Sequence, residues 1–208
     1  MKRILAATLL FCFIFAGCTS YPPISLHKSE HGVEIRGSVT AEQAKELDLI
    51  LSVLPRSVIR SVASLSSRED SSHFSNVEIG HCHWNRHICI VNWLFTNAST
   101  IWHEIGHAYT FYLNYKGPRF RDRWQEIPGG VITAYGATNY LEDVAEWVSE
   151  IYCLLTGRFS AVTLLKSSGE FFKDSYLKKL ELLRDYGFIS SENYEKILSP
   201  YARSGVAR

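Results

Sequence analysis

The sequence predicts an α+β fold that is mostly helical, with a small sheet beside one central helix. Apolar residues recur at helical spacing in several segments of the second half of the chain. Short segments before residue 96 alternate as strands do, and the helix that directly follows them contains His-Glu-x-x-His, from His103 to His107. With 208 residues, the chain suits one domain with one sizeable core.

The N-terminus has the features of a secretory signal. Lys2 and Arg3 precede an apolar run from Ile4 to Phe15, which is too short to span a bilayer as a mature helix. Small residues then lead directly into Cys18, a pattern that resembles the lipobox of bacterial lipoproteins. This resemblance implies cleavage before Cys18 and lipidation of its thiol. The alternative is an ordinary secreted protein in which Cys18 has no special role.

These features predict the domain organisation and the location of the protein. Residues 1–17 are expected to be the signal peptide, residues 18–38 the lipidated cysteine and a polar tether, and residues 39–208 one domain. The protein is expected outside the cytoplasm, held on a membrane by its lipid. In a Gram-negative bacterium, Thr19 after the cysteine favours the outer membrane, facing the periplasm.

Charge excludes nucleic acid as a partner. The chain has 22 Lys and Arg against 21 Asp and Glu, and two of the basic residues belong to the predicted signal. No basic run follows the signal, so neither nucleic acid nor an electrostatic membrane contact is indicated. The lipid is the expected link to the membrane.

Local patterns predict the elements before the central helix. A strand is expected around Val33 to Val39, and Thr40 with the residue three positions later forms a capping box for a helix that Pro55 ends. A short helix is expected over residues 58–65 and a loop over residues 66–72.

A hairpin is expected next, with strands over residues 74–79 and 87–95 and a turn from Gly80 to Arg86. Cys82 and Cys89 lie at the end of this hairpin. Because disulfides persist in exported proteins, we expect these two cysteines to be bridged.

His81, His83 and His87 surround the same cysteines and offer a rival metal site. His-x-His on a strand places both rings on one face of the sheet. A disulfide would remove both thiolates from such a site, and loops often gather histidines that bind nothing. The hairpin is therefore an alternative to the central helix.

The central helix carries the most specific pattern. Residues four apart on a helix lie one above the other, so His103 and His107 can bind a single ion. Glu104 is rotated by about 100° from His103, where a general base can take a proton from a water that the metal activates. About 0.02 such matches are expected by chance. The alternative is a surface helix whose histidines bind nothing, but apolar neighbours on the histidine face argue against it.

Beyond the central helix, a polar loop is expected over residues 119–130 and helices over residues 140–155, 170–185 and 191–198. A catalytic zinc needs three protein ligands and an open position. No histidine follows His107, which excludes a third histidine downstream of the motif. Spacing alone does not choose among the candidates, which are Glu126, Glu142, Asp143, Glu146 and Glu150.

The stretch from Ala134 to Glu146 resembles the second motif of the anthrax lethal factor peptidase family. It contains Tyr-Gly-x-Thr-Asn followed by Glu-x-x-Ala-Glu, after the earlier His-Glu-x-x-His. The resemblance covers residues 101–155 and implies a zincin-like fold of the gluzincin type with one Zn²⁺ per chain. It also implies that Glu142 is the third ligand, beside the two histidines, and that Tyr135 stabilises the oxyanion.

The remaining acids of this motif suggest supporting roles. Glu146 or Asp143 is expected to orient a ligand histidine. Asp143 stands where the toxin family is apolar, and the toxin's recognition domains are missing, so its substrate does not transfer. The expected function is a membrane-anchored zinc endopeptidase that acts on peptides or proteins. The alternative is a zinc-binding lipoprotein without catalysis, against which the presence of Glu104 argues.

Overall fold

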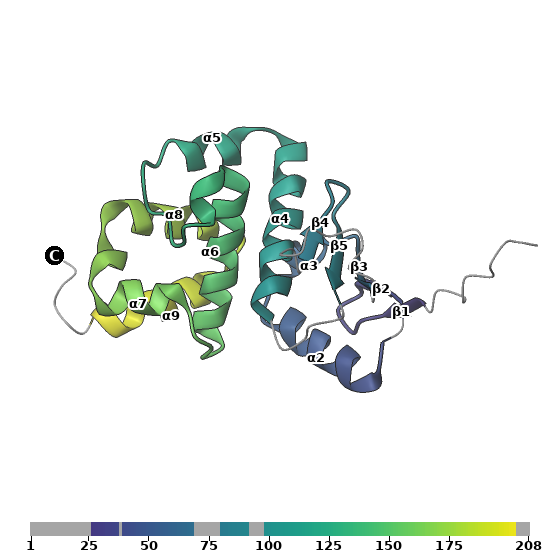
Figure 1. Cartoon of the computed structure of the whole chain (residues 1–208). Helices are drawn as coiled ribbons and strands as arrows, with labels where there is room; N and C mark the ends of the chain where they lie inside the picture. Colours follow the sequence, from purple (N-terminus) through teal and green to yellow (C-terminus); the bar gives the residue numbers. More distant parts are fainter. Residues whose placement is uncertain (1–25, 38, 69–79, 92–97, 203–208) are drawn as a thin grey trace, which may run out of the picture.

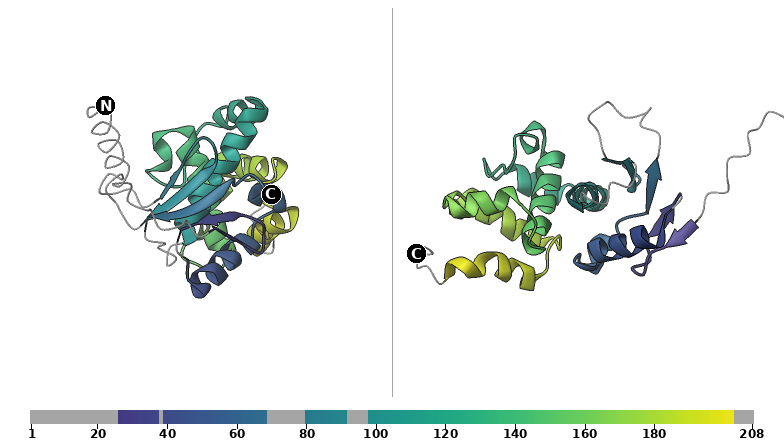
Figure 2. Two further views of the ribbon diagram at one scale, coloured as in Figure 1. Left: turned by 90° about the vertical axis from the view of Figure 1, so that its right-hand side faces the viewer. Right: turned by 60° about the horizontal axis from the view of Figure 1, so that its bottom comes forward.

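The computed structural model describes residues 26–37, 39–68, 80–91 and 98–202, which form a small sheet and a larger set of helices (Figure 1). Helix α4 (Ala98–Lys116) stands between the sheet and α6 (Tyr140–Leu155). Figure 2 shows the same order of layers, with α4 seen nearly end-on in its right-hand view. The α+β class is confirmed, and the helix with the His-Glu-x-x-His motif lies at the centre of the fold.

The sheet has five described strands in the order β1-β2-β3-β5-β4. β1 (Leu26–Lys28) is antiparallel to β2 (Glu34–Arg36), and β2 is parallel to β3 (Ser64–Arg68). β3 is parallel to β5 (His87–Val91), and β4 (Gly80–Cys82) is antiparallel to β5. Among the described strands, β4 therefore lies at the edge, and it packs against α4.

The folded domain begins earlier than predicted. Both β1 and β2 lie within the segment that was expected to be a tether, so the boundary at residue 39 is wrong. Val33 and Ile35 are buried, because the alternation that predicts this strand places its apolar side chains in the core. β1 has only three residues and carries no comparable pattern, so its pairing with β2 depends on tertiary structure.

Two predictions before β4 are wrong. The helix expected over residues 58–65 is a four-residue helix, α3 (Arg56–Ile59), and the expected loop begins inside β3. Three of the five residues of β3 are serines, and serine-rich segments are usually predicted to be loops. The strand forms because its backbone pairs on both sides, with β2 and with β5.

Helix α2 (Ala41–Ser52) is confirmed together with its capping box. The backbone N–H of Gln43 donates to Thr40 Oγ1 over 3.2 Å, and the backbone N–H of Thr40 donates to Gln43 Oε1 over 2.8 Å. Trp102 of α4 is buried and donates from Nε1 to the Ile50 carbonyl over 3.1 Å. This bond fixes α2 to the central helix.

The predicted hairpin is present, but its turn is shorter. Gly80 to Cys82 form β4, and the turn covers residues 83–86, where the Arg86 N–H donates to the His83 carbonyl over 2.7 Å. The strand predicted over residues 74–79 lies outside the described residues, as does the end of the one predicted over residues 87–95.

The predicted disulfide between Cys82 and Cys89 is wrong, because both thiols are free and buried. Cys82 pairs with Ile88 across the ladder, and Cys89 pairs with His81. Residues directly opposite each other share a face of the sheet, so the two cysteines point to opposite faces. Side chains that diverge in this way cannot be bridged without moving the backbone.

The C-terminal half differs from prediction in four places. The expected loop after α4 contains helix α5 (Arg119–Gln125), which buries Phe120 and Trp124 one turn apart, and α7 (Ala161–Ser167) was not predicted. The helix expected over residues 170–185 is divided at the extended Lys173 into the 3₁₀ helix η2 (Glu170–Phe172) and α8 (Asp174–Asp185). The last helix, α9 (Ser191–Ala202), continues past its predicted end at residue 198.

Helix α6 has its predicted bounds, and the short 3₁₀ helix η1 (Gly136–Thr138) precedes it.

The predicted signal, Cys18 and the first part of the tether lie outside the described residues. Within residues 26–202, apart from the gaps given above, no helix combines the length and apolar character needed to cross a membrane.

Candidate metal centre

The side chains of His103, His107 and Glu142 meet between α4 and α6. The two histidine Nε2 atoms lie 3.1 Å apart, and Glu142 Oε2 lies 3.1 Å from His103 Nε2 and 3.2 Å from His107 Nε2. Asn139 caps α6 by accepting from the N–H of Glu142 over 3.1 Å, which places this glutamate in the first turn beside α4. The structure thus brings together the three residues proposed as ligands.

This group can hold a metal ion. Two imidazole nitrogens and one carboxylate oxygen suit divalent transition metals, zinc among them. Zinc–nitrogen and zinc–oxygen bonds of about 2.0–2.1 Å place the ligand atoms of a tetrahedral site about 3.3 Å apart. The observed separations of 3.1–3.2 Å fit that spacing. No other described group of His, Cys, Asp and Glu side chains is arranged to hold a metal.

Glu146 supports His103 from the side away from this group. Its Oε1 lies 2.9 Å from His103 Nδ1, and its Oε2 accepts from Thr133 Oγ1 over 2.7 Å. Thr133 in turn accepts from the backbone N–H of Gly136 over 3.0 Å. The expected contact between Glu146 and a histidine of the motif is therefore present. Thr133 was not predicted from the sequence. This threonine acts through its hydrogen bond to Glu146 of α6, and no local sequence pattern marks such a residue.

Asp143 does not orient a histidine, so that alternative is wrong. Its Oδ2 accepts from Trp124 Nε1 over 2.8 Å and from Lys179 Nζ over 2.5 Å. One residue of helical rotation from Glu142 turns Asp143 away from α4 and toward α5 and α8. Burial raises the pKa of Asp143 and lowers that of Lys179, and the bond between them opposes both shifts. Asp143 therefore joins three helices.

Glu104 is buried beside the metal-binding group and close to the edge strand. A Cβ added to Gly80 of β4 would lie 2.9 Å from Glu104 Oε1, so only a glycine leaves room for this carboxylate. The pKa of Cys82 is raised by burial and by the charge of Glu104, and the same charge helps to raise that of His103. Glu104 thus lies close to the edge strand, and its charge acts on both Cys82 and His103.

Tyr135 lies on the exposed side of the group. Its ring centroid is 5.9 Å from that of His103, and 56% of its surface is accessible. Thr138 Oγ1 donates to the Tyr135 carbonyl over 2.8 Å and holds the short helix that begins there. Tyr135 is therefore a largely exposed residue whose ring lies next to that of His103.

The protonation of the group reflects competition between burial and hydrogen bonds. Burial alone lowers the pKa of His103, but hydrogen bonds with Glu142 and Glu146 outweigh it and raise the pKa to about 9. Burial keeps the pKa of His107 below its usual value despite its bond with Glu142. Burial alone raises the pKa of Glu142, but the two histidines hold it well below its usual range. Without a metal, the group therefore retains a proton on His103 at neutral pH.

The rival histidine site receives no support. The rings of His81 and His83 have centroids 4.6 Å apart, and His87 is 6.1 Å from His83. His87 Nδ1 lies 2.5 Å from Ser64 Oγ, and its Nε2 lies 3.1 Å from Ser66 Oγ. Both nitrogens of His87 therefore have serine partners, and these residues do not form a metal-binding group.

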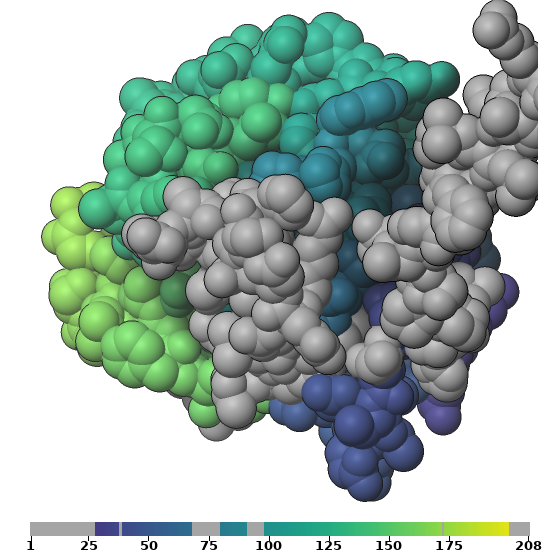
Figure 3. Space-filling model, turned by 45° about the vertical axis from the view of Figure 1, so that its right-hand side comes forward, coloured from purple at the N-terminus to yellow at the C-terminus, as the bar shows by residue number. Residues whose placement is uncertain are grey.

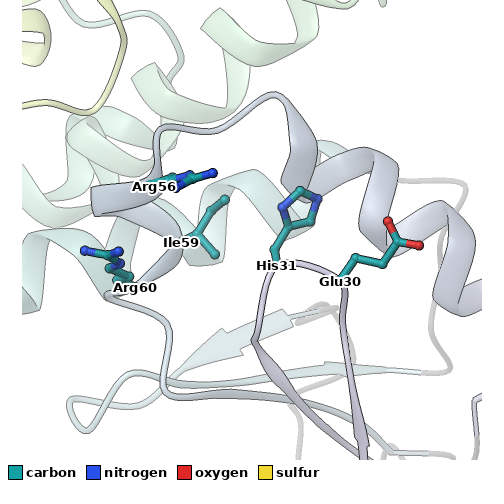
Figure 4. Close-up of a pocket in the computed structure, with 5 residues that line it drawn as sticks. All are labelled: Glu30, His31, Arg56, Ile59 and Arg60. Atoms are coloured by element: carbon teal, nitrogen blue, oxygen red, sulfur yellow. The ribbon is translucent and has the colours of Figure 1, made fainter.

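A pocket of about 220 Å³ lies between α3 and the turn that joins β1 to β2 (Figure 4). Arg56 and Ile59 of α3 and the adjoining Arg60 line one side of it, and Glu30 and His31 of the turn between β1 and β2 line the other. His31 Nε2 lies 3.1 Å from the Asp48 carbonyl. None of these residues was predicted to be functional, and the pocket shares none with the metal centre.

Comparison with known proteins assigns no family to the chain. No protein-family model, no curated protein and no solved structure matches it. The geometry of the metal-binding group and the chemistry of its side chains are therefore the basis on which a function can be proposed.

Proposed function

We propose that the protein is a zinc-dependent endopeptidase of the gluzincin type, with His103, His107 and Glu142 as zinc ligands. The observation that carries the proposal is the convergence of these three side chains within 3.2 Å of one another, beside the buried carboxylate of Glu104. A structural zinc site is closed by four protein ligands and needs no base. Three ligands with an adjacent carboxylate are the arrangement that hydrolysis requires.

Each side chain then has a distinct role. When bound, zinc supplies Lewis acidity, which lowers the pKa of a water to about 7 and polarises the carbonyl of the substrate. Glu104 accepts a proton from the attacking water and delivers it to the departing amine nitrogen as the C–N bond breaks. The hydroxyl of Tyr135 donates a hydrogen bond to the carbonyl oxygen as that atom gains negative charge. Glu146, held by Thr133, keeps the ring of His103 oriented.

The edge strand supports a peptide as substrate. β4 pairs with β5 on one side and packs against the helix that carries Glu104. An extended peptide can add to the exposed edge of a strand through backbone hydrogen bonds. We propose that β4 aligns the substrate in this way across the metal centre.

The location proposed for this activity comes from the N-terminal pattern. Cleavage before Cys18 and lipidation of its thiol would hold the domain on a membrane outside the cytoplasm. Metabolic labelling with a fatty acid tests this step, because Cys18→Ser would abolish the label while leaving the metal centre intact. Equal labelling of both proteins would contradict the anchor.

Metal content and hydrolysis test the function together. The purified protein is expected to bind about one zinc per chain and to cleave an unstructured protein such as casein. Glu142→Ala should lose most of the zinc, whereas Glu126→Ala, an exposed glutamate that was a candidate ligand, should keep it. Glu104→Gln should retain zinc and lose hydrolysis by roughly 10² to 10⁴-fold.

The two measurements separate the alternatives. If the native chain binds zinc but does not hydrolyse casein, it is a non-catalytic zinc-binding protein. Full hydrolysis by Glu104→Gln would show that the base is wrong. Zinc loss in Glu126→Ala but not in Glu142→Ala would place the metal elsewhere.

A further inference from the structure

Exposed aromatic side chains and basic side chains meet at one end of the molecule. Trp84, in the turn between β4 and β5, is 84% exposed, and Tyr115, in the last turn of α4, is 92% exposed. Arg86 lies 5.7 Å from the centre of the Tyr112 ring, and Lys116 lies 4.5 Å from it. These contacts join the hairpin turn to the end of α4. We call this the basic-aromatic surface, made of Trp84, Arg86, Tyr112, Tyr115, Lys116 and Arg119.

The figures agree with this placement. In Figure 1 the turn between β4 and β5, the end of α4 and the start of α5 all lie at the top of the molecule. Figure 3 shows the blue atoms of the hairpin beside the teal atoms of the α4–α5 region along the upper surface. Two segments that are distant in sequence therefore form one continuous surface.

All charged residues of this surface are basic. It contains Arg86, Lys116 and Arg119, while no acidic residue occurs in residues 83–86 or 112–119. The whole chain has a formal charge of only +1. Among the described residues, none of the three cations has an ion-pair partner. A cluster of three cations of this kind would attract an anionic partner.

The backbone of the turn adds to this observation. Arg86 is the only described residue other than glycine with a positive φ, at 66°. Glycine or asparagine adopts this conformation at lower cost, and an arginine there is unusual. Such outliers concentrate at functional positions. The turn therefore presents a cation beside Trp84 at some cost to the backbone.

We infer that the basic-aromatic surface docks on a membrane that contains anionic lipids, with Trp84 and Tyr115 at headgroup level. Trp and Tyr favour the membrane–water interface because their rings are apolar and their N–H or O–H remains hydrated. Lys and Arg beside them attract anionic headgroups. Both aromatic rings stand almost wholly exposed on a turn and a helix end, which suits insertion into a lipid surface better than enclosure of a peptide side chain.

This contact would orient the metal centre. His107 lies eight residues before Tyr115 on α4, which corresponds to about 12 Å along the helix axis. His107 and Phe111 have nearly parallel rings 6.2 Å apart, so the aromatic row continues toward the metal centre. The metal centre would therefore be held close to the membrane surface. The docking itself does not depend on peptidase activity.

Fluorescence quenching by lipid tests the inference on the full chain. Vesicles of brominated phosphatidylcholine with about one third phosphatidylglycerol quench a tryptophan that enters the headgroup region. Of the five tryptophans, Trp102, Trp124 and Trp147 are buried, and Trp93 lies outside the described residues. The signal of Trp84 is therefore taken as the difference between the native chain and Trp84→Phe, because all the other tryptophans are common to both. This difference is independent of any attachment through the N-terminal segment, which both proteins share.

We expect clearly stronger quenching in the native chain than in Trp84→Phe. Arg86→Gln/Lys116→Gln should weaken the vesicle-dependent signal of Trp84 by on the order of tenfold. The matched control Lys45→Gln/Arg56→Gln removes two exposed charges elsewhere and should leave the signal unchanged. All variants should unfold at the same temperature as the native chain. A difference in quenching then reflects lipid binding and not a loss of folded protein.

Three results would overturn the inference. The first is the same quenching in Trp84→Phe as in the native chain, and the second is equal quenching of Trp84 by vesicles of phosphatidylcholine alone. The third is a change in Trp84 emission on adding polyglutamate but not vesicles, which would assign the surface to acidic peptides. None of these results bears on zinc binding or hydrolysis, so failure here is distinguishable from failure of the proposed function.

Discussion

Gly106 of α4 and Ala145 of α6 face each other where the two helices come closest. A Cβ on residue 106 would lie 3.0 Å from Cα of Ala145 and 3.2 Å from Cβ of Val148. The second variable residue of the His-Glu-x-x-His motif therefore has to be small. This close approach brings the first turn of α6 near enough for Glu142 to reach both histidines.

Gly106→Ala is expected to weaken zinc binding by about tenfold, because the helices must separate to admit the methyl group. Alanine favours a helix over glycine by about 1 kcal/mol, so stability falls less than overpacking alone would predict. Titration against a chelator measures the affinity, and thermal unfolding measures stability. Unchanged zinc affinity would show that the spacing of the helices does not control the site.

Gly80→Ala is expected to displace the carboxylate of Glu104 without removing the metal. The new methyl group would lie 2.9 Å from Glu104 Oε1 and 2.9 Å from Thr100 Cγ2. A shift of about 1 Å in a catalytic group costs on the order of 10²-fold in rate. We expect kcat for peptide hydrolysis to fall by that amount with zinc content unchanged. A normal kcat would contradict the role assigned to Glu104.

Replacing Glu142 and Glu146 in turn distinguishes a ligand from its support. Glu142→Ala should remove most of the bound zinc, whereas Glu146→Ala should weaken affinity by about 10- to 100-fold. The reason is that Glu146 contacts His103 Nδ1 and not the converging Nε2 atoms. Competition with a chelator gives both affinities, and equal losses would mean that both carboxylates bind the metal.

Zinc affinity is expected to rise with pH. In the metal-free protein the pKa of His103 is raised to about 9, so its ring carries a proton at lower pH. Zinc requires the neutral ring and must displace that proton, which opposes binding below the pKa. Apparent affinity should rise about tenfold per pH unit from about pH 7 to 9 and then level off. Glu142→Ala and Glu146→Ala should move the levelling point to lower pH, and a flat profile would contradict this account.

Lys179→Met tests the buried ion pair that joins α8 to α6. Lys179 and Asp143 are both buried, so removing the cation leaves an uncompensated carboxylate. We expect a loss of about 3–5 kcal/mol in the free energy of unfolding, measured with urea. Lys179→Met/Asp143→Asn should recover much of this loss, because no lone charge remains buried. If the double variant is as unstable as the single one, the loss of stability comes from altered packing and not from an unpaired charge.

The sequence by itself determined the elements whose signals are local. The capping box of α2, the bounds of α6 and the two histidines four residues apart on α4 all follow from spacing along one segment. Helical rotation also explains why Glu104 lies beside the histidines and why Glu142 and Glu146 share a face. These relations need no knowledge of other segments, because the geometry of a helix fixes them.

Tertiary structure decided what depends on contacts between distant segments. The serine-rich β3 becomes a strand because β2 and β5 pair with it, and the ladder register turns Cys82 and Cys89 to opposite faces. Helical spacing alone did not decide which acidic residue contacts the histidines. The approach of α6 to α4 places Glu142 at both Nε2 atoms, Glu146 at Nδ1 and Asp143 toward Lys179. Backbone pairing and helix packing carry no local signal, because each needs a partner from elsewhere in the chain.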